Sequence, residues 1–240
     1  MVEFEIKIRE LKPINIEGGF VIDGLPSVGI TNAIATESLI NTPDYELAAI
    51  LDSEIFPPIA VIKDGIPNYT TNIFVNNKLK TAVFSSQLSI PEVLHREAAK
   101  LLLSWSKNHK CSLIISSVPT PIPISTEDGF FAAGSTESAN SKLKDAKIHI
   151  ILNGIIPGIP GLLLNEGRLE NQDVIVIVFN PEKEKLPDFK TGAKLCGVIS
   201  KLIPGASCNI SMLEKIAEKI EDSIKKTETE TKHMKDSIYR

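Results

Sequence analysis

The segment that most constrains the fold is an uninterrupted apolar run in the last third of the chain, DVIVIVF at residues 173–179. A strand with one face in water alternates apolar and polar residues, whereas a strand of a parallel sheet is covered on both faces and is apolar throughout. The run therefore predicts a central strand of a parallel sheet. Such a sheet needs helices on both faces, so the rest of the chain must supply strands that alternate with helices.

The remaining sequence shows this alternation. Residues 3–9 alternate between charged and apolar side chains, which is typical of a strand with one wet face. Further strands are expected at residues 20–25, 45–52, 59–63, 111–118 and 148–152, with a hairpin formed by residues 68–76 and 78–85 around Asn76-Asn77. Helices are expected after Ser27, whose hydroxyl can cap the first one, after Pro91, and at residues 136–145, 162–170 and 187–203. The proline-rich stretch from Pro119 to Gly134 is expected to be a loop.

These elements predict a three-layer α/β/α domain with a mostly parallel mixed sheet. We expect residues 1–225 to form this single domain and to end in an amphipathic helix, for which Ser211 and Glu214 provide a capping box. Residues 226–240 are polar and charged, and this composition predicts a flexible tail. No internal repeat or linker divides the chain before residue 225.

The composition narrows the class of partner. Hydrophobic residues make up 42% of the chain and charged residues 23%, as in an ordinary globular domain. The net charge of −4 argues against a nucleic-acid partner, which would need a basic surface. No apolar run approaches the ~20 residues that span a bilayer, and the N-terminus lacks the apolar core of a signal peptide. We therefore expect a cytoplasmic protein without a nucleic-acid or membrane partner.

The cysteines and histidines form no recognisable site. Cys111, Cys196 and Cys208 are too few and too scattered for a disulfide framework. Cys111 and Cys196 fall in apolar patterns and are interpreted as small core residues. The four histidines share no spacing that suits a common metal ion. We expect no metal and no cofactor.

Two turns place candidate groups at strand ends. GLPSVGI, from Gly24 to Ile30, joins a strand to a helix, where backbone amides can hold a phosphate or carboxylate. It lacks the spacing of a dinucleotide or phosphate loop, so we favour a tight turn with close packing, in which Gly24 and Gly29 are needed for their conformation. An anion site that includes Pro26 and Ser27 is the alternative. Glu54, close to Asp52, is a weak candidate for catalysis because such a pair is equally typical of a solvated turn.

The sequence assembles no nucleophile, base and orienting group. It has no G-x-S-x-G motif. GIPGLLLNEG at residues 158–167 either borders a pocket at the carboxyl end of the sheet or, as we favour, forms a rigid turn into an apolar helix. We expect no catalytic residues, and hence a protein that is not an enzyme.

The C-terminus ends in Ser237-Ile238-Tyr239-Arg240 after the polar tail. With 3 Tyr in 240 residues and 42% hydrophobic residues, an apolar–Tyr pair at these positions arises by chance in about one chain in two hundred. A free carboxylate, an aromatic ring and an apolar neighbour on a flexible tether suit capture by a pocket with a cationic floor. The sequence therefore favours a binding role for this end of the chain.

Taken in order, GLPSVGI, the turn from Glu54 to Pro58 and GIPGLLL resemble the proteasome assembly chaperone two family over roughly residues 15–205. The resemblance implies an α/β/α fold similar to nucleoside phosphorylases and hydrolases, without known catalysis, and assembly into small homo-oligomers. It also implies binding to proteasome α-subunits or the core particle. In that complex Ile238 would contact an apolar wall, Tyr239 would anchor the pocket and the Arg240 carboxylate would pair with a pocket lysine.

Two other functions are compatible with the sequence. One is an enzyme or small-molecule binder of the phosphorylase type that uses the Gly24–Gly29 turn for an anion or a nucleotide. The other is a scaffold whose oligomer surface binds a different protein.

Overall fold

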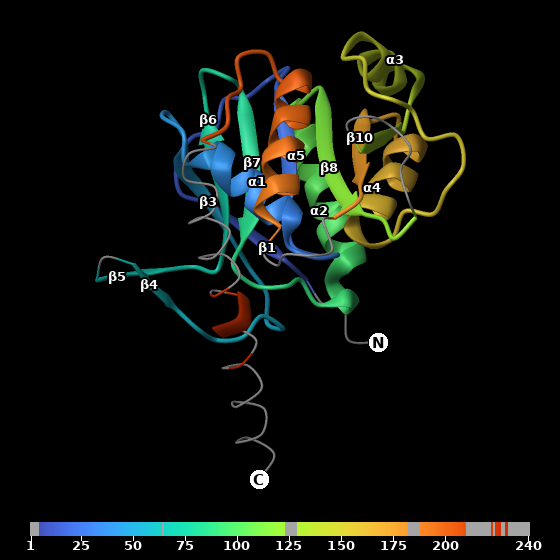
Figure 1. Cartoon of the computed structure of the whole chain (residues 1–240). Coiled ribbons are helices and arrows are strands. Elements are labelled where there is room, and N and C mark those ends of the chain that lie inside the picture. The colour runs from blue at the N-terminus through green and yellow to red at the C-terminus, as the bar shows by residue number, and fades with distance from the viewer. Residues whose placement is uncertain are drawn as a thin grey trace.

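The computed structural model describes residues 5–63, 65–122, 129–181 and 188–209, together with residues 222, 224–226 and 229. Within these residues an eight-stranded mixed sheet has the strand order β1-β3-β6-β7-β2-β8-β10-β9, and β4 and β5 form a separate two-stranded sheet (Figure 1). The strands are β1 (Lys7–Glu10), β2 (Phe20–Gly24), β3 (Glu46–Asp52), β4 (Val61–Lys63), β5 (Ile66–Asn68), β6 (Thr71–Asn76), β7 (Thr81–Ser86), β8 (Leu113–Pro119), β9 (Phe130–Gly134) and β10 (Val174–Phe179). The helices are α1 (Thr31–Ile40), α2 (His95–Asn108), α3 (Glu137–Asp145), α4 (Gly158–Leu169) and α5 (Phe189–Leu202), with a 3₁₀ turn (Glu92–Leu94) before α2.

The centre of the sheet is parallel and its flanks are antiparallel. β2 is parallel to both β7 and β8, and β8 is parallel to β10. The pairs β1–β3, β3–β6, β6–β7 and β9–β10 are antiparallel, so β2, β3, β7, β8 and β10 all run in one direction. This arrangement confirms the predicted mostly parallel mixed sheet of an α/β fold. All six residues of β10 are buried, as the unbroken apolar run required.

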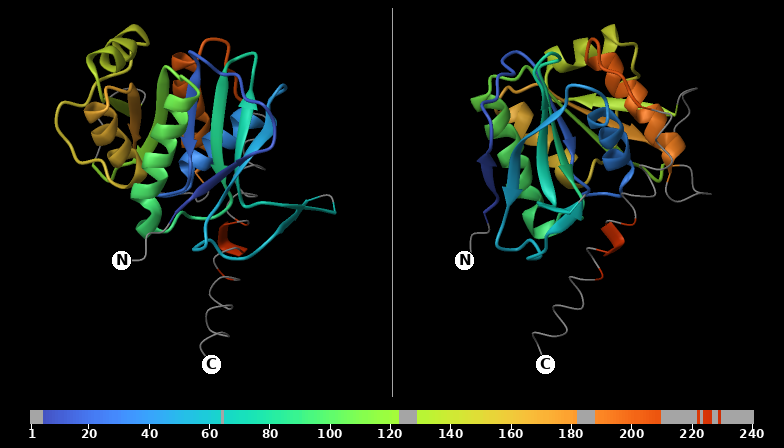
Figure 2. Two further views of the ribbon diagram at one scale, coloured as in Figure 1. Left: turned by 180° about the vertical axis from the view of Figure 1, so that it is seen from behind. Right: turned by 90° about the vertical axis from the view of Figure 1, so that its left-hand side faces the viewer.

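Helices cover both faces of the sheet (Figures 1 and 2). Alternate residues of a strand point to opposite faces, and β10 accordingly divides its side chains between two clusters. Val174 and Val176 belong to the cluster that contains residues of α2 and α4. Ile175 and Ile177 belong to the cluster that contains residues of α1, α3 and α5. The three predicted layers are therefore present.

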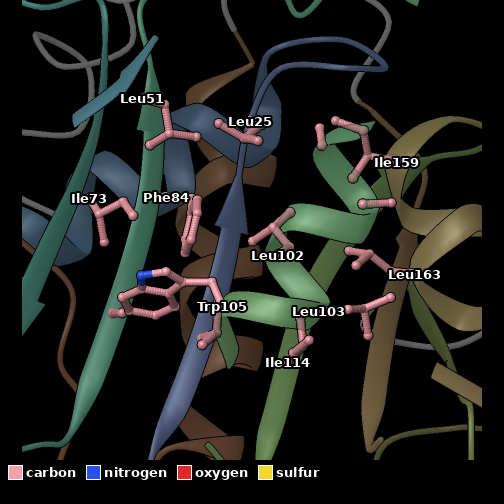
Figure 3. Packing of buried hydrophobic residues seen from close by; sticks show 14 of the residues in the cluster. Leu25, Leu51, Ile73, Phe84, Leu102, Leu103, Trp105, Ile114, Ile159 and Leu163 are labelled. Atoms are coloured by element: carbon pink, nitrogen blue, oxygen red, sulfur yellow. The ribbon is translucent and has the colours of Figure 1, made fainter. Parts of the chain in front are cut away.

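The larger cluster is centred on aromatic and aliphatic side chains between α2 and the sheet (Figure 3). Trp105 of α2 meets Phe84 of β7 edge to face, with ring centroids 5.3 Å apart. The Trp105 indole N–H donates to Glu10 Oε1 at 3.3 Å, so its polar atom also has a partner. Leu102 and Leu103 fill the space between this pair and α4. The helix predicted after Pro91 is thus present, and α2 packs its apolar residues against the sheet.

Two predictions about the third quarter of the chain are wrong. Residues 148–152 do not form a strand, because only Ile150 bridges to Ala132 at the outer edge of β9. The expected loop from Pro119 to Gly134 ends in β9, whose apolar residues pair antiparallel with β10. The turn-forming residues ahead of β9 concealed a strand of five residues. Its outer side is then covered by backbone hydrogen bonds with His149 and Ile151, at 2.8 and 2.9 Å.

The predicted C-terminal helix and the tail lie almost entirely outside the described residues. Residues 222, 224–226 and 229 are helical, and the Ile224 side chain is buried. Among the helices that the structure describes, none is long and apolar enough to cross a membrane. The division of the chain near residue 225 stays a prediction.

Candidate functional site

The turn at residues 24–30 lies at the carboxyl end of β2, in the middle of the sheet. β2 runs parallel to its neighbours β7 and β8, so the ends of all three strands lie at one edge. A Cβ atom at Gly24 would lie 2.4 Å from Thr36 Oγ1 in α1 and 2.5 Å from the Phe84 carbonyl oxygen in β7. Only glycine permits this approach of helix and strand. The geometry supports the packing interpretation of Gly24.

A buried carboxylate lies directly before the turn. Asp23 is 1% exposed; the Ser116 hydroxyl donates to its Oδ2 at 2.7 Å and the Leu25 amide donates to its Oδ1 at 3.1 Å. Burial raises the pKa of Asp23 to about 6, and these two hydrogen bonds offset only part of that rise. The Leu25 amide is thus already bound to an acidic group. A second anion at this turn would meet the same carboxylate.

The prediction that Ser27 caps the first helix is wrong, because α1 begins only at Thr31. Gly29 has a left-handed φ of 71°, which turns the chain between Ser27 and the helix. Ile30 occupies the N-cap position without a side-chain hydrogen bond. The Asn32 side chain binds the helix start instead: its Oδ1 accepts from the Ala33 amide at 2.8 Å and its Nδ2 donates to the Leu25 carbonyl at 2.9 Å. Asn32 therefore occupies an amide that an anion would need.

The two glycine–proline segments of the sequence pack against each other. α4 begins at Gly158, where a Cβ atom would lie 2.7 Å from Val28 Cγ2 and 3.1 Å from Ser27 Oγ. The Ile90 amide donates to the Pro26 carbonyl at 2.9 Å. The turns after β2, before α2 and before α4 therefore meet at the carboxyl edge of the sheet. Pro26 is buried there, whereas Ser27 is half-buried and Gly29 is exposed.

Glu54 lies apart from this turn. Its side chain is exposed and borders a hollow of about 480 Å³ that Leu51, Phe56 and Tyr69 help to line. β6 and β7 separate β3 from β2 in the sheet, which corresponds to about 14 Å at the usual strand spacing. The nearby Asp52 Oδ1 accepts from the Ser53 amide at 2.9 Å, an arrangement typical of a turn. The structure thus brings Gly24, Pro26, Ser27 and Gly29 together but leaves Glu54 separate.

A polar hollow at the opposite edge of the sheet was not foreseen from the sequence. It measures about 710 Å³ and lies between α3, α4 and the amino ends of β8 and β10. Asp173 at its wall accepts from Ser138 Oγ at 2.6 Å and from Thr136 Oγ1 and Lys142 Nζ. Burial alone would raise the pKa of Asp173, but the hydrogen bonds from these three groups and the Lys142 charge together lower it. The carboxylate fixes the start of α3, where Thr136 is the N-cap.

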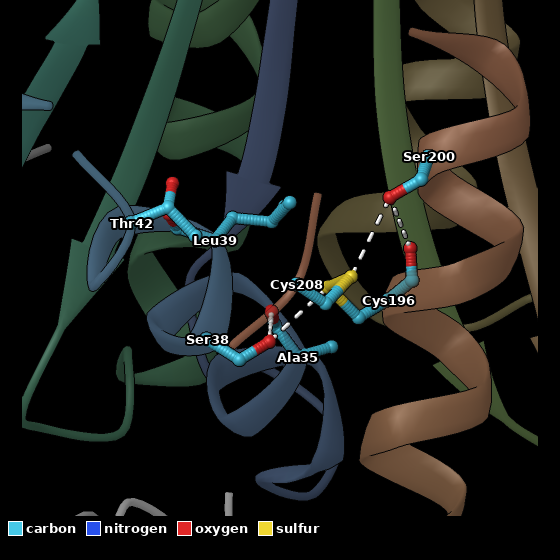
Figure 4. Close-up of a disulfide and its surroundings, with 7 residues drawn as sticks. All are labelled: Ala35, Ser38, Leu39, Thr42, Cys196, Ser200 and Cys208. Atoms are coloured by element: carbon cyan, nitrogen blue, oxygen red, sulfur yellow. Dashed lines mark hydrogen bonds between the residues drawn. A yellow bond between two sulfur atoms is a disulfide. The ribbon is translucent and has the colours of Figure 1, made fainter. Parts of the chain in front are cut away.

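Cys196 lies in the core as predicted, but the expectation that the cysteines are too scattered to form a disulfide is wrong. Cys196 in α5 is fully buried but forms a disulfide with Cys208, and the Ser38 hydroxyl of α1 donates to its sulfur at 3.1 Å (Figure 4). The chain reverses at Gly205, which has a φ of 83°, and so brings Cys208 back to the helix. The spacing of twelve residues did not reveal this reversal. The bond fastens the segment that precedes the C-terminal region to the body of the domain.

Cys111 is the free cysteine, and it is buried. Burial raises the pKa of its thiol to about 11. A thiol of this kind is a poor nucleophile near neutral pH. In the ranges that the structure describes, no three histidine, cysteine or carboxylate side chains are grouped to hold a metal ion. Ile238, Tyr239 and Arg240 lie outside those ranges, so their binding role remains a prediction.

Comparison with known proteins places this fold. A sequence model of the PAC2 family matches residues 21–228. An uncharacterized protein of Methanocaldococcus jannaschii is 24% identical over 231 residues, which are 96% of this chain and 93% of the relative.

Two solved structures from Pyrococcus furiosus share the fold. PbaA, an archaeal homolog of proteasome-assembly chaperone, matches with a TM-score of 0.77 and 23% identity over 95% of this chain and 100% of its own. PbaB, an archaeal proteasome activator, matches with a TM-score of 0.70 and 22% identity over 93% of this chain and 99% of its own. The family match extends over most of the domain and includes both glycine–proline turns. The chain belongs to the PAC2 family.

Proposed function

We propose that this protein is a proteasome assembly chaperone-like factor of the cytoplasm that binds proteasome α-subunits or the α-ring and does not act as an enzyme. The observation that carries the proposal is the PAC2 match over residues 21–228, together with a fold shared over nearly the whole chain with PbaA and PbaB. The packed, hydrogen-bonded state of the Gly24–Gly29 turn supports it, because the turn has a structural explanation that requires no ligand.

In this proposal the C-terminal residues dock between neighbouring α-subunits. Ile238 contacts an apolar wall, Tyr239 fills the pocket and the Arg240 carboxylate pairs with a lysine of the partner. Ordering of the tail and of its side chains on binding would offset much of the contact energy, so a single tail binds weakly. A homo-oligomer presents several tails at once, and avidity then raises the affinity by roughly 10²–10⁴. Self-association and tail docking therefore act together.

A pull-down tests this mechanism. Purified α-subunits and assembled core particles are incubated with the full chain, with a chain truncated before Ser237, and with Tyr239→Ala. Arg240→Ala is the matched control, because it changes the last side chain and keeps the terminal carboxylate. Binding by the full chain and the control, and its loss in the other two, is the expected result. Equal binding by all four chains would move the docking surface onto the folded domain, and no binding by any would contradict the proposal.

The alternative function is an enzyme or small-molecule binder of the phosphorylase type that uses the Gly24–Gly29 turn. The Leu25 and Ala33 amides are already bound by Asp23 and Asn32, and this geometry disfavours an anion there. A thermal-shift screen with phosphate, nucleosides and nucleotides decides the question. A ligand at a hundred times its dissociation constant stabilises by about 2.7 kcal/mol, which raises Tm by roughly 5–11 °C in a chain of this size. A shift of that size with one ligand class would favour the alternative.

A further inference from the structure

The connection between β3 and β6 carries an arm that projects from the domain. β4 and β5 pair with each other as a two-stranded sheet, apart from the eight-stranded one, and extend beyond its carboxyl edge (Figures 1 and 2). Ile62 and Ile66 are each 64% exposed. An isolated two-stranded hairpin is marginally stable in water. An arm of this kind gains stability when another surface covers it.

Each face of the arm carries one exposed isoleucine. Ile62 lies opposite Pro67, and the next pair along the strands joins Lys63 and Ile66. Opposed residues of an antiparallel pair share a face, and successive residues alternate between faces. Ile62 and Ile66 therefore project from opposite faces, so covering one side by the body of the domain would still leave an isoleucine in water. This pattern fits insertion of the arm between other surfaces.

The edges of the main sheet are protected against pairing with another chain. β1 exposes Lys7, Arg9 and Glu10 along one edge, and charged residues there discourage pairing with another chain. The edge at β9 is covered by the backbone of His149 and Ile151. The sequence of the arm also contains charged residues, Lys63 and Asp64, but its two isoleucines are exposed. These exposed isoleucines mark the arm as an element that another surface covers.

The same connection also contains an apolar hollow at the base of the arm. It measures about 480 Å³ and is lined by Leu51, Phe56, Pro57, Ile59 and Tyr69, and also by polar residues that include Asp52 and Glu54. A volume of this size lies in the range, about 300–1,000 Å³, that binds compact apolar ligands. The β4–β5 arm extends away from the eight-stranded sheet (Figure 1). An arm from a second chain is then the complementary occupant.

We propose that two copies of this chain exchange arms, each inserting Ile62 and Ile66 into the hollow at the base of the other's arm. The size of the contact favours this reciprocal arrangement. A standard protein interface uses about 20–30 residues on each side. Residues 51–70 contain both the hollow and the arm and number about twenty. Each copy reaches the standard size only when its hollow and its arm both take part in the contact. Such a contact is related by a two-fold axis and closes on itself. The inference rests on the self-association in the proposed function and names its surface.

Light scattering after size-exclusion chromatography tests the exchange on the full chain. The variant Ile62→Lys/Ile66→Lys places charges on both faces of the arm. The matched control is Leu152→Lys/Ile155→Lys, which alters two aliphatic side chains that are 88% and 92% exposed in another loop. The expected result is an even number of chains for wild type and control, and a mass reduced to half or less in the arm variant. A monomeric wild type, an arm variant of unchanged mass, or an equal loss in the control would overturn the proposal.

A second experiment identifies the occupant directly. Chains with Ile66→Cys and chains with Ala60→Cys, carrying different affinity tags, are mixed and mildly oxidised. A cross-linked dimer that carries both tags is expected, because Ala60 lines the hollow. Its absence would mean that the arm of one chain does not reach the hollow of another. Neither experiment contains a proteasome subunit, so failure here leaves the pull-down result intact, and failure of the pull-down leaves this one intact.

Discussion

Replacing Gly24 with alanine tests whether the turn after β2 is dictated by packing. The added Cβ would lie 2.4 Å from Thr36 Oγ1 and 2.5 Å from the Phe84 carbonyl oxygen. The Phe84 oxygen belongs to the backbone of β7, so relief of the contact requires α1 or a strand to move. Overpacking of this kind lowers the free energy of unfolding by about 1–3 kcal/mol. Because two contacts are this short, we expect Gly24→Ala to lower it by about 2–3 kcal/mol. In a chain of this size that lowers Tm by roughly 4–12 °C.

Differential scanning calorimetry measures this effect, and Gly197→Ala serves as the matched control. Gly197 is an exposed residue of α5 and a Cβ there meets no atom within 4 Å. The free energy of unfolding of Gly197→Ala is expected to rise by about 0.5–1 kcal/mol, because alanine is a better helix former than glycine. Together the two variants separate a local clash from a general effect of alanine. A Gly24→Ala protein that melts with the wild type would refute the packing explanation of the turn and restore the case for a ligand.

Three further predictions follow from single groups. Cys208→Ser opens the loop of twelve residues closed by Cys196 and should cost about 3 kcal/mol of unfolding free energy; a denaturant titration that matches wild type would contradict the disulfide. Asp23 has a pKa raised from 3.8 to about 6, so the folded state binds its proton more tightly and loses stability as the pH rises through that interval, by about 3 kcal/mol in total. Between about pH 4 and about pH 7 the unfolding free energy of Asp23→Asn should therefore rise relative to that of wild type, by up to the same amount. Calorimetry over a pH series measures this difference, and a difference that stays constant would refute the raised pKa of Asp23. Lys142→Met removes a charge that lowers the pKa of Asp173, so carbon NMR should record a higher pKa for that carboxyl. On acidification, the stability that the Asp173 carboxylate contributes should then be lost at a higher pH than in wild type. An unchanged pKa would show that the hydroxyls of Thr136 and Ser138 alone keep it low.

The strongest sequence signals predicted the architecture because they report burial directly. The apolar run at residues 173–179 is a central strand, and its alternate residues enter two different cores. The apolar residues of α2 likewise lie on the face that packs on the sheet. Patterns of this kind can be recognised within a short segment of sequence, and in this protein the tertiary contacts agree with them.

The errors arose where a long-range contact decides the structure. Ser27 is a good helix cap by composition, but Gly29 turns the chain first and Asn32 bonds the helix start. Cys208 meets Cys196 only after a reversal at Gly205 that spacing alone does not reveal. The Asp173 network joins groups that are more than thirty residues apart in sequence. Residue type predicted the chemistry of such groups, whereas their partners required the fold.

The candidate site was predicted in part. The glycines of GLPSVGI were expected at a strand-to-helix turn, and they lie there. The expected turn in GIPGLLL is instead the first turn of α4, and it packs on the turn after β2. The distance between Glu54 and the first turn follows from the strand order, which inserts β6 and β7 between them. The projecting arm also escaped prediction, since short apolar strands have the same sequence pattern whether they are covered or exposed. Exposure became visible only when the neighbouring elements were in place.

The most direct test of the proposed function is a binding titration of the full chain against assembled proteasome core particles and against isolated α-subunits. Saturable binding is expected, with an affinity that falls when the chain is truncated before Ser237 and also when the arm variant lowers the number of tails in each oligomer. Absence of binding by a folded, oligomeric full chain would contradict the proposal and leave PAC2 membership as a statement about fold alone.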